Sequence, residues 1–229
     1  MSVRSALILD PSSPADPDLA LTASCDAILL DSSGVSARRL HPVERPLPAI
    51  WLRLPPLNGA DIEAELARLR PLRPTAFVPT GAETAADIDH LGALLAVQEA
   101  SIGLPDGTFG ILAIVETAGA VFEIHRMARA SPRLIGIGWD GEALAKDLGA
   151  DEGRDPGGRW TDPLQTVRTL VLAAAADARL AAIDSPARHV DLAEFRTEAE
   201  RAARDGFSGK LVVSAEQAAI ADAAFAAKS

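Results

Sequence analysis

FGILAIVETAGAVFEIHRMARASPRLIGIGWDGEALAKDLGA, residues 109 to 150, contains two short apolar runs separated by a segment with helical spacing. The runs are ILAIV, residues 111 to 115, and LIGIG, residues 134 to 138. Between them, Val121, Ile124 and Ala128 recur at intervals that place them on one face of a helix. The stretch therefore predicts a strand, a helix and a second strand.

Acidic residues follow both of these predicted strands. Glu116 comes directly after the first run, and Asp140 and Glu142 come just after the second. Two parallel strands joined by a helix have their carboxyl ends at the same edge of the sheet. The sequence therefore predicts that these carboxylates converge at one edge.

The composition excludes several classes of function. The net charge is -10 at pH 7, and the basic residues are scattered, whereas nucleic-acid binding needs clustered Lys and Arg. The longest nearly apolar stretch, residues 170 to 176, is far shorter than the roughly 20 residues that span a bilayer. The single Cys25 cannot form an internal disulfide, so a reducing, cytoplasmic location is expected.

Eight short apolar runs alternate with helical segments along the chain. The other six runs are residues 6–9, 26–31, 49–53, 75–79, 179–184 and 210–214. This alternation predicts a (β/α)8 TIM barrel that forms a single domain over residues 1–229, with a mobile loop at residues 151–163. The competing fold is a doubly wound open sheet, but no glycine-rich phosphate fingerprint follows the first run.

The carboxyl ends of barrel strands carry the catalytic loops, so the polar residues there are the candidate site. They are Asp10, Asp31, Arg53, Thr80, Glu116, Asp140, Glu142, Asp184 and Ser214. Carboxylates can hold a divalent metal, and an arginine can pair with a carboxylate or thioester oxygen of a substrate. Strand ends are also polar simply because they meet water, and Asp31 and Asp184 are balanced between a site role and loop anchoring.

Glu116 is the strongest of these candidates. It follows five apolar residues, and the next residue, Thr117, is suited to cap a helix. We therefore expect its carboxylate to be partly buried and to need a partner.

Several segments, in this order and at these intervals, resemble the HpcH/HpaI aldolase and citrate lyase beta-subunit-like superfamily. They are ILAIVETAGAV, ASPRLIGIG with EALAKDLGA, AAID and GFSGKLVVSAEQ, with weaker similarity in DAILLD and WLR. The resemblance implies a trimeric barrel that uses Mg²⁺, or Mn²⁺, to make or break a carbon–carbon bond. It implies small-molecule substrates: 3-hydroxyacyl-CoA thioesters such as malyl-, citramalyl- or citryl-CoA, or a related 2-oxo acid. By motif position, Arg53 is the catalytic, substrate-binding arginine and Glu116 is a catalytic metal ligand.

The chain also departs from the family pattern at several polar positions. The family's second metal ligand is an Asp directly after a Glu, but here Glu142 is followed by Ala143, which leaves Asp140 as the replacement ligand and Glu142 as a further candidate metal ligand. The other departures are Ser32-Ser33-Gly34 after Asp31, Pro55 after Arg53, Thr80 after Pro79, and Ser214-Ala215-Glu216. We retain Asp31, Asp184 and Ser214 as candidate substrate contacts. Two hypotheses follow: the chain is a lyase with a rearranged site, or it is a catalytically impaired barrel that serves in binding or assembly.

Overall fold

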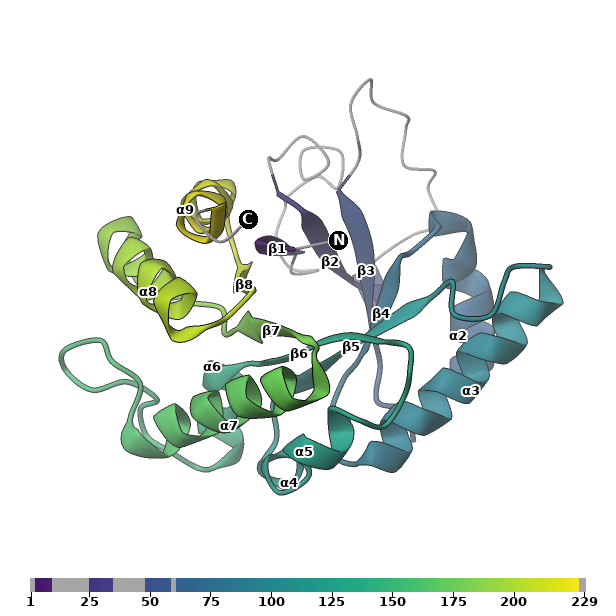
Figure 1. The fold of residues 1–229 in the computed structure, drawn as a ribbon, viewed down its shortest axis with the longest axis horizontal. Helices are drawn as coiled ribbons and strands as arrows, with labels where there is room; N and C mark the ends of the chain where they lie inside the picture. The colour runs from purple at the N-terminus through teal and green to yellow at the C-terminus, as the bar shows by residue number, and fades with distance from the viewer. Residues whose placement is uncertain (1–2, 10–24, 35–47, 59–60, 227–229) are drawn as a thin grey trace.

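The computed structural model describes residues 3–9, 25–34, 48–58 and 61–226, and these form a closed barrel of eight parallel strands (Figure 1). The strands are β1 (Ser5–Leu9), β2 (Ala27–Asp31), β3 (Ala49–Leu54), β4 (Ala76–Pro79), β5 (Gly110–Val115), β6 (Leu134–Trp139), β7 (Ala181–Asp184) and β8 (Gly209–Val212). Each strand pairs with the next in sequence, and β8 pairs with β1 through Ser5 and Lys210. The predicted (β/α)8 barrel is confirmed.

Helices pack along the outside of the barrel, with α2 and α3 on one flank and α8 and α9 on the other (Figure 1). The helices are α2 (Ile62–Leu69), α3 (Ala85–Ser101), α4 (Ala118–Val121), α5 (Ile124–Met127), α6 (Gly141–Asp147), α7 (Asp162–Ala178), α8 (Leu192–Asp205) and α9 (Ala215–Ala226), with short 3-10 turns at Ser32–Gly34 and Arg70–Leu72. Most begin at a residue whose side chain accepts a backbone N–H, as Thr84 does at the start of α3.

The segment between β5 and β6 differs from the prediction of one continuous helix. It forms two single-turn helices, because Phe122 and Glu123 donate i→i+3 bonds to Gly119 and Ala120 and interrupt the α-helical ladder. The predicted apolar face is nevertheless present, since Ile124 is buried. Both single-turn helices lie on the outside of the barrel (Figure 1).

Alternate residues of each strand point to opposite sides of the barrel wall. The barrel interior contains Leu29, Trp51, Ile114, Ile183 and Leu211, among other small and branched residues. The neighbouring residues in sequence, such as Leu30, Leu52, Val115, Ala182 and Val212, pack against the helices. This alternation decides which strand-end residues face the barrel mouth.

Continuing the alternation to the strand ends divides the predicted site residues into two groups. Arg53 and Glu116 lie two residues after the interior Trp51 and Ile114, so they share the interior phase. Asp184 lies two residues after Ala182, so it has the exterior phase. A shift of one residue along a strand therefore decides whether a side chain faces the barrel mouth or the layer between the sheet and the helices.

One loop, between α6 and α7, has regular backbone pairing. Residues 154 to 160 form a hairpin in which Arg154 and Trp160 make an antiparallel bridge, and the mobility predicted for residues 151–163 stays a prediction. Asp10 lies outside the described residues. In the part of the chain that is described, no helix is both long and apolar enough to cross a membrane.

Candidate active site at the barrel mouth

An ion pair between Arg53 and Glu116 lies at the mouth of the barrel. The Nη1 of Arg53, at the end of β3, is 3.2 Å from Oε2 of Glu116, just after β5. Glu116 is only 8% exposed, and its other oxygen, Oε1, accepts a 2.7 Å hydrogen bond from the backbone N–H of Gly81. Glu116 was predicted to be partly buried and to need a partner; it has two partners and is more deeply buried than predicted.

Gly81 brings its N–H to this carboxylate through an unusual backbone conformation. Its φ is +63°, in the left-handed region that glycine adopts without steric cost. The preceding Thr80 donates its own N–H to the carbonyl of Leu54, which ties the turn to the end of β3. The loop after β4 thus spans from Arg53's strand to Glu116 and fixes one oxygen of the carboxylate.

Asp140 lies beside Glu116 on the neighbouring strand end. Its backbone N–H donates to the carbonyl of Val115 at 3.0 Å, which aligns the residue after β6 with the residue after β5. Its carboxylate is 2% exposed and caps α6, because Oδ1 accepts from the N–H groups of Glu142 and Ala143. The predicted convergence of the two acidic strand ends is therefore present in the backbone.

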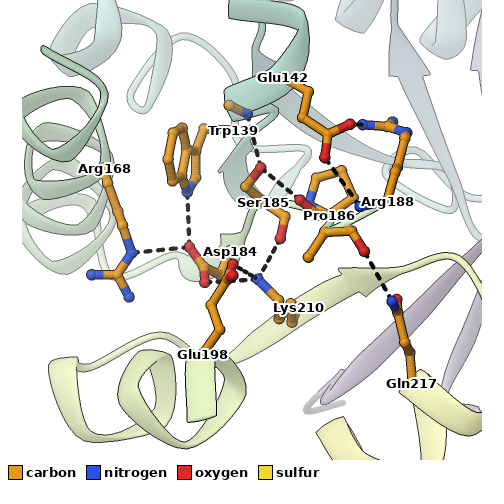
Figure 2. Close-up of polar contacts among 12 residues, drawn as sticks. Trp139, Glu142, Arg168, Asp184, Ser185, Pro186, Arg188, Glu198, Lys210 and Gln217 are labelled. Atoms are coloured by element: carbon orange, nitrogen blue, oxygen red, sulfur yellow. Dashed lines mark hydrogen bonds and ion pairs between the residues drawn. The ribbon is translucent and has the colours of Figure 1, made fainter. Parts of the chain in front are cut away.

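Arg188, in the loop after β7, binds the carboxylates of Asp140 and Glu142. Its Nη2 and Nη1 donate to Oδ2 and Oδ1 of Asp140 at 2.8 and 3.2 Å. Nη1 also lies 3.1 Å from Oε2 of Glu142, and the backbone N–H of Arg188 donates to Oε1 of Glu142 (Figure 2). We call Arg53, Glu116, Asp140, Glu142 and Arg188 the mouth cluster.

Sequence reasoning missed Arg188. It follows no apolar run directly, since Ser185, Pro186 and Ala187 separate it from β7. The available signal was chemical: Asp140 and Glu142 add two negative charges at one strand end, and buried carboxylates need partners.

Asp31 and Ser214 make only local contacts among the described residues. Asp31 Oδ1 accepts from the backbone N–H and the hydroxyl of Ser33. The hydroxyl of Ser214 accepts from the N–H of Gln217, as a cap for α9. Asp31 has the interior phase and pairs in register with Arg53, so it remains next to the mouth cluster.

Asp184, predicted as a substrate contact, lies instead in a buried network outside the barrel (Figure 2). It is fully buried, and it accepts from Trp139 Nε1 at 2.9 Å, Arg168 Nε at 3.2 Å and Lys210 Nζ at 3.1 Å. Lys210 is also fully buried and reaches Glu198 Oε1 at 2.8 Å. We call Trp139, Arg168, Asp184, Glu198 and Lys210 the outer cluster.

The charges in the outer cluster stabilise one another's ionised forms. Burial acts to raise the pKa of Asp184, but the charges of Lys210 and Arg168 outweigh it, so the pKa lies below its usual value. Burial acts to lower the pKa of Lys210, and Asp184 and Glu198 raise it above its usual value. Both groups are therefore charged at neutral pH, and Asp184 has no oxygen turned to the mouth.

The mouth cluster offers oxygen ligands of the kind that Mg²⁺ prefers. An ionised carboxylate has about four acceptor positions, and Glu116 uses one for Gly81 and one for Arg53. Asp140 already accepts four hydrogen bonds, two of them from Arg188. Glu116 therefore has acceptor positions left for a ligand, whereas Oδ2 of Asp140 is shared with the guanidinium of Arg188. The described residues contain no group of three or more His, Cys, Asp or Glu that could hold a metal, although Mg²⁺ is often bound by one or two carboxylates with water and substrate.

Comparison with known proteins gives a family match over most of the chain. The model of the HpcH/HpaI aldolase/citrate lyase family matches residues 37–215. The citrate lyase subunit beta of Leuconostoc mesenteroides subsp. cremoris is 32% identical over 136 residues, which are 59% of this chain and 43% of that protein. The match thus spans less than half the length of this curated relative.

Solved structures from Mycobacterium tuberculosis have the same fold. The citrate lyase beta subunit complexed with oxaloacetate and magnesium superposes with a TM-score of 0.78 at 23% identity, covering 98% of this chain and 97% of that one. Protein CitE in complex with magnesium, acetoacetate and coenzyme A gives 0.77 at 25% identity, covering 96% and 80%. Both of these structures, which resemble this chain over nearly its whole length, contain magnesium.

Proposed function

Because the chain belongs to the HpcH/HpaI aldolase/citrate lyase family, we propose that it is a divalent-metal-dependent carbon–carbon lyase acting on a 3-hydroxyacyl-CoA thioester. Malyl-, citramalyl- and citryl-CoA are the substrates to test first, followed by related 2-oxo acids. The observation that carries the proposal is the part-buried Arg53–Glu116 ion pair at the barrel mouth. A pair of this kind joins an anion-binding group to a metal-binding one.

Arg53 is suited to orient the substrate. Its guanidinium spends one N–H on Glu116 and is 20% exposed, so other donors remain for a carboxylate or thioester oxygen. A guanidinium presents its donors in a planar fork that matches a carboxylate, which fixes direction as well as position. Holding the reacting bond in one orientation is itself a large contribution to catalysis.

Glu116 is suited to hold the metal and to fix Arg53 at once. Gly81 and Arg53 bind opposite oxygens of its carboxylate, so the group cannot rotate freely. Cleavage of a 3-hydroxyacyl thioester breaks the C2–C3 bond, leaves the electron pair on the thioester fragment as an enolate, and turns the C3 hydroxyl into a carbonyl with loss of its proton. A bound Mg²⁺ or Mn²⁺ would supply Lewis-acid stabilisation of the negative charge that develops on oxygen.

The proposal is tested by incubating the protein with each acyl-CoA and Mg²⁺ and following release of the smaller thioester. We expect turnover in the native protein and at least a hundredfold loss in Glu116→Gln, since loss of one electrostatic contact to a reacting group costs about that much. Glu83→Gln, at an exposed carboxylate of the loop after β4, is a matched control that removes the same charge. Turnover that survives in Glu116→Gln would overturn the role given to Glu116, and absence of turnover with every substrate and metal would favour the impaired-barrel alternative.

A further inference from the structure

Arg188 holds the carboxylate that the proposed metal site needs. It donates two hydrogen bonds to Asp140, one to each oxygen, and two more to Glu142, one of them from its backbone. Burial acts to lower the pKa of Arg188, and the hydrogen bonds and charges of the two carboxylates raise it above its usual value. The guanidinium therefore stays positively charged, and it binds both carboxylates directly.

From this arrangement we propose that Arg188 is an internal counterion that competes with the divalent metal for Asp140. The inference rests on the proposed function, because it takes Glu116 and Asp140 as the metal-binding pair. Oδ1 of Asp140 accepts three of the four hydrogen bonds, two from α6 and one from Arg188, so Oδ2, which accepts only from Arg188 Nη2, is the oxygen that a metal ion would bind. A metal ion at Oδ2 shares this oxygen with the guanidinium, and the two positive charges repel each other, so each weakens the binding of the other.

The structure also indicates which of the two partners moves. Asp140 is 2% exposed and anchored by the first N–H groups of α6, so its carboxylate is fixed. The side chain of Arg188 is 33% exposed. Its backbone is held, since its N–H donates to Glu142 and the carbonyl of the preceding Ala187 accepts from Gln217. The expected motion is therefore a rotation of the Arg188 side chain over a stationary loop, with Asp140 left in place.

Direct measurement of metal binding tests the proposal without reference to turnover. Isothermal titration with Mg²⁺, and electron paramagnetic resonance with Mn²⁺, would be carried out on the native protein and on Arg188→Gln. We expect the variant to bind metal about tenfold more tightly, the size of effect given by removing one competing, partly exposed charge-assisted pair. Arg188→Lys keeps the charge but not the two-pronged fork, so it should fall between the two.

Two further variants separate competition at Asp140 from a general change of charge. Arg159→Gln removes the same charge from an exposed position of the 154–160 hairpin, and we expect metal affinity within about twofold of native. In an Asp140→Asn background, Arg188→Gln should no longer tighten binding, because the group being competed for is gone. Circular dichroism and the thermal midpoint would establish that each variant is folded.

The possible results separate this inference from the proposed function. Tighter binding in Arg188→Gln that disappears with Asp140→Asn supports it. Equal affinity in native protein and Arg188→Gln overturns the competition while leaving the lyase proposal standing, and weaker binding in the variant assigns Arg188 a supporting role instead. If neither protein binds Mg²⁺ or Mn²⁺, the metal-dependent function fails, and the competition fails with it.

Discussion

The mouth cluster and the outer cluster are built from the same kinds of residue and do different things. Both join carboxylates to basic side chains, and each contains an acidic residue at the carboxyl end of a strand. In the mouth cluster the arginines are part-exposed, at 20% for Arg53 and 33% for Arg188, and bind carboxylates that face the barrel opening. In the outer cluster Asp184 and Lys210 are fully buried between the sheet and the helices.

The difference arises from one residue of strand phase. Glu116 continues the interior face of β5 and Asp184 continues the exterior face of β7, although each ends an apolar run. A carboxylate of the first kind has acceptor positions left for a ligand, whereas one of the second kind is surrounded by protein donors. Being acidic and lying at a strand end does not by itself place a residue in a site.

The largest expected effect is on stability, from Asp184→Asn. Removing the charge leaves Lys210 and Arg168 without their shared buried partner, and breaking a buried ion pair typically costs about 3–5 kcal/mol. Urea unfolding should show this loss. The matched control is Asp205→Asn, which removes a 36% exposed carboxylate from the same Arg168 and should cost less than about 1 kcal/mol. Similar costs for the two would contradict the contrast drawn between buried and exposed partners.

The pH dependence of stability should follow the same cluster. The pKa of Asp184 is lower in the folded protein than its value of about 3.9 in an unfolded chain, so the unfolded state takes up the proton first as pH falls. The stabilisation by Asp184 is therefore complete above that value and is lost as pH falls below it towards the folded pKa. Unfolding free energies measured between pH 5 and pH 3, values chosen to bracket about 3.9, should fall more steeply for the native protein than for Asp184→Asn. Parallel curves would assign acid sensitivity to other carboxylates.

Arg53→Lys tests the mouth cluster, where we expect a loss of turnover with little loss of stability. The variant keeps a positive charge for Glu116 but loses the planar fork, so we expect about a tenfold loss in lyase turnover with a stability change of less than about 1 kcal/mol. Turnover assays on the best acyl-CoA and urea unfolding on the same preparations would give both numbers. A large loss of stability with turnover per folded molecule unchanged would show that Arg53 belongs with the structural pairs.

Much of the fold could be predicted because the barrel is encoded locally. The apolar runs are short and largely buried, and from β3 onward at least one helix lies between each strand and the next, so periodicity indicates the elements and the barrel follows from their alternation. The interruption at Phe122 and Glu123 was missed because the apolar stripe continues across it. Local pattern reports which face is buried, and it does not report which hydrogen bonds the backbone makes.

The candidate site was less predictable, because it depends on partners far apart in sequence. Glu116 could be singled out from its own surroundings, but Gly81 and Arg53 reach it across separations of 35 and 63 residues. Arg188 lies 48 residues from Asp140 and carries no motif. Asp184 could have been assigned to the outer face by counting alternate residues along β7, since Ile183 occupies the interior position.

Ser214→Ala gives the smallest expected effect and tests where the mouth cluster ends. The hydroxyl caps α9 by accepting from Gln217, and loss of such a cap costs about 1 kcal/mol. If the cap is its whole role, thermal unfolding should register that loss, turnover should stay within about twofold, and Ser214→Thr, which retains a capping hydroxyl, should recover most of the stability. A tenfold fall in turnover with stability restored by threonine would instead make Ser214 a substrate contact. The site would then extend to the end of β8, and the hydroxyl of Ser214 would both cap α9 and contact the substrate.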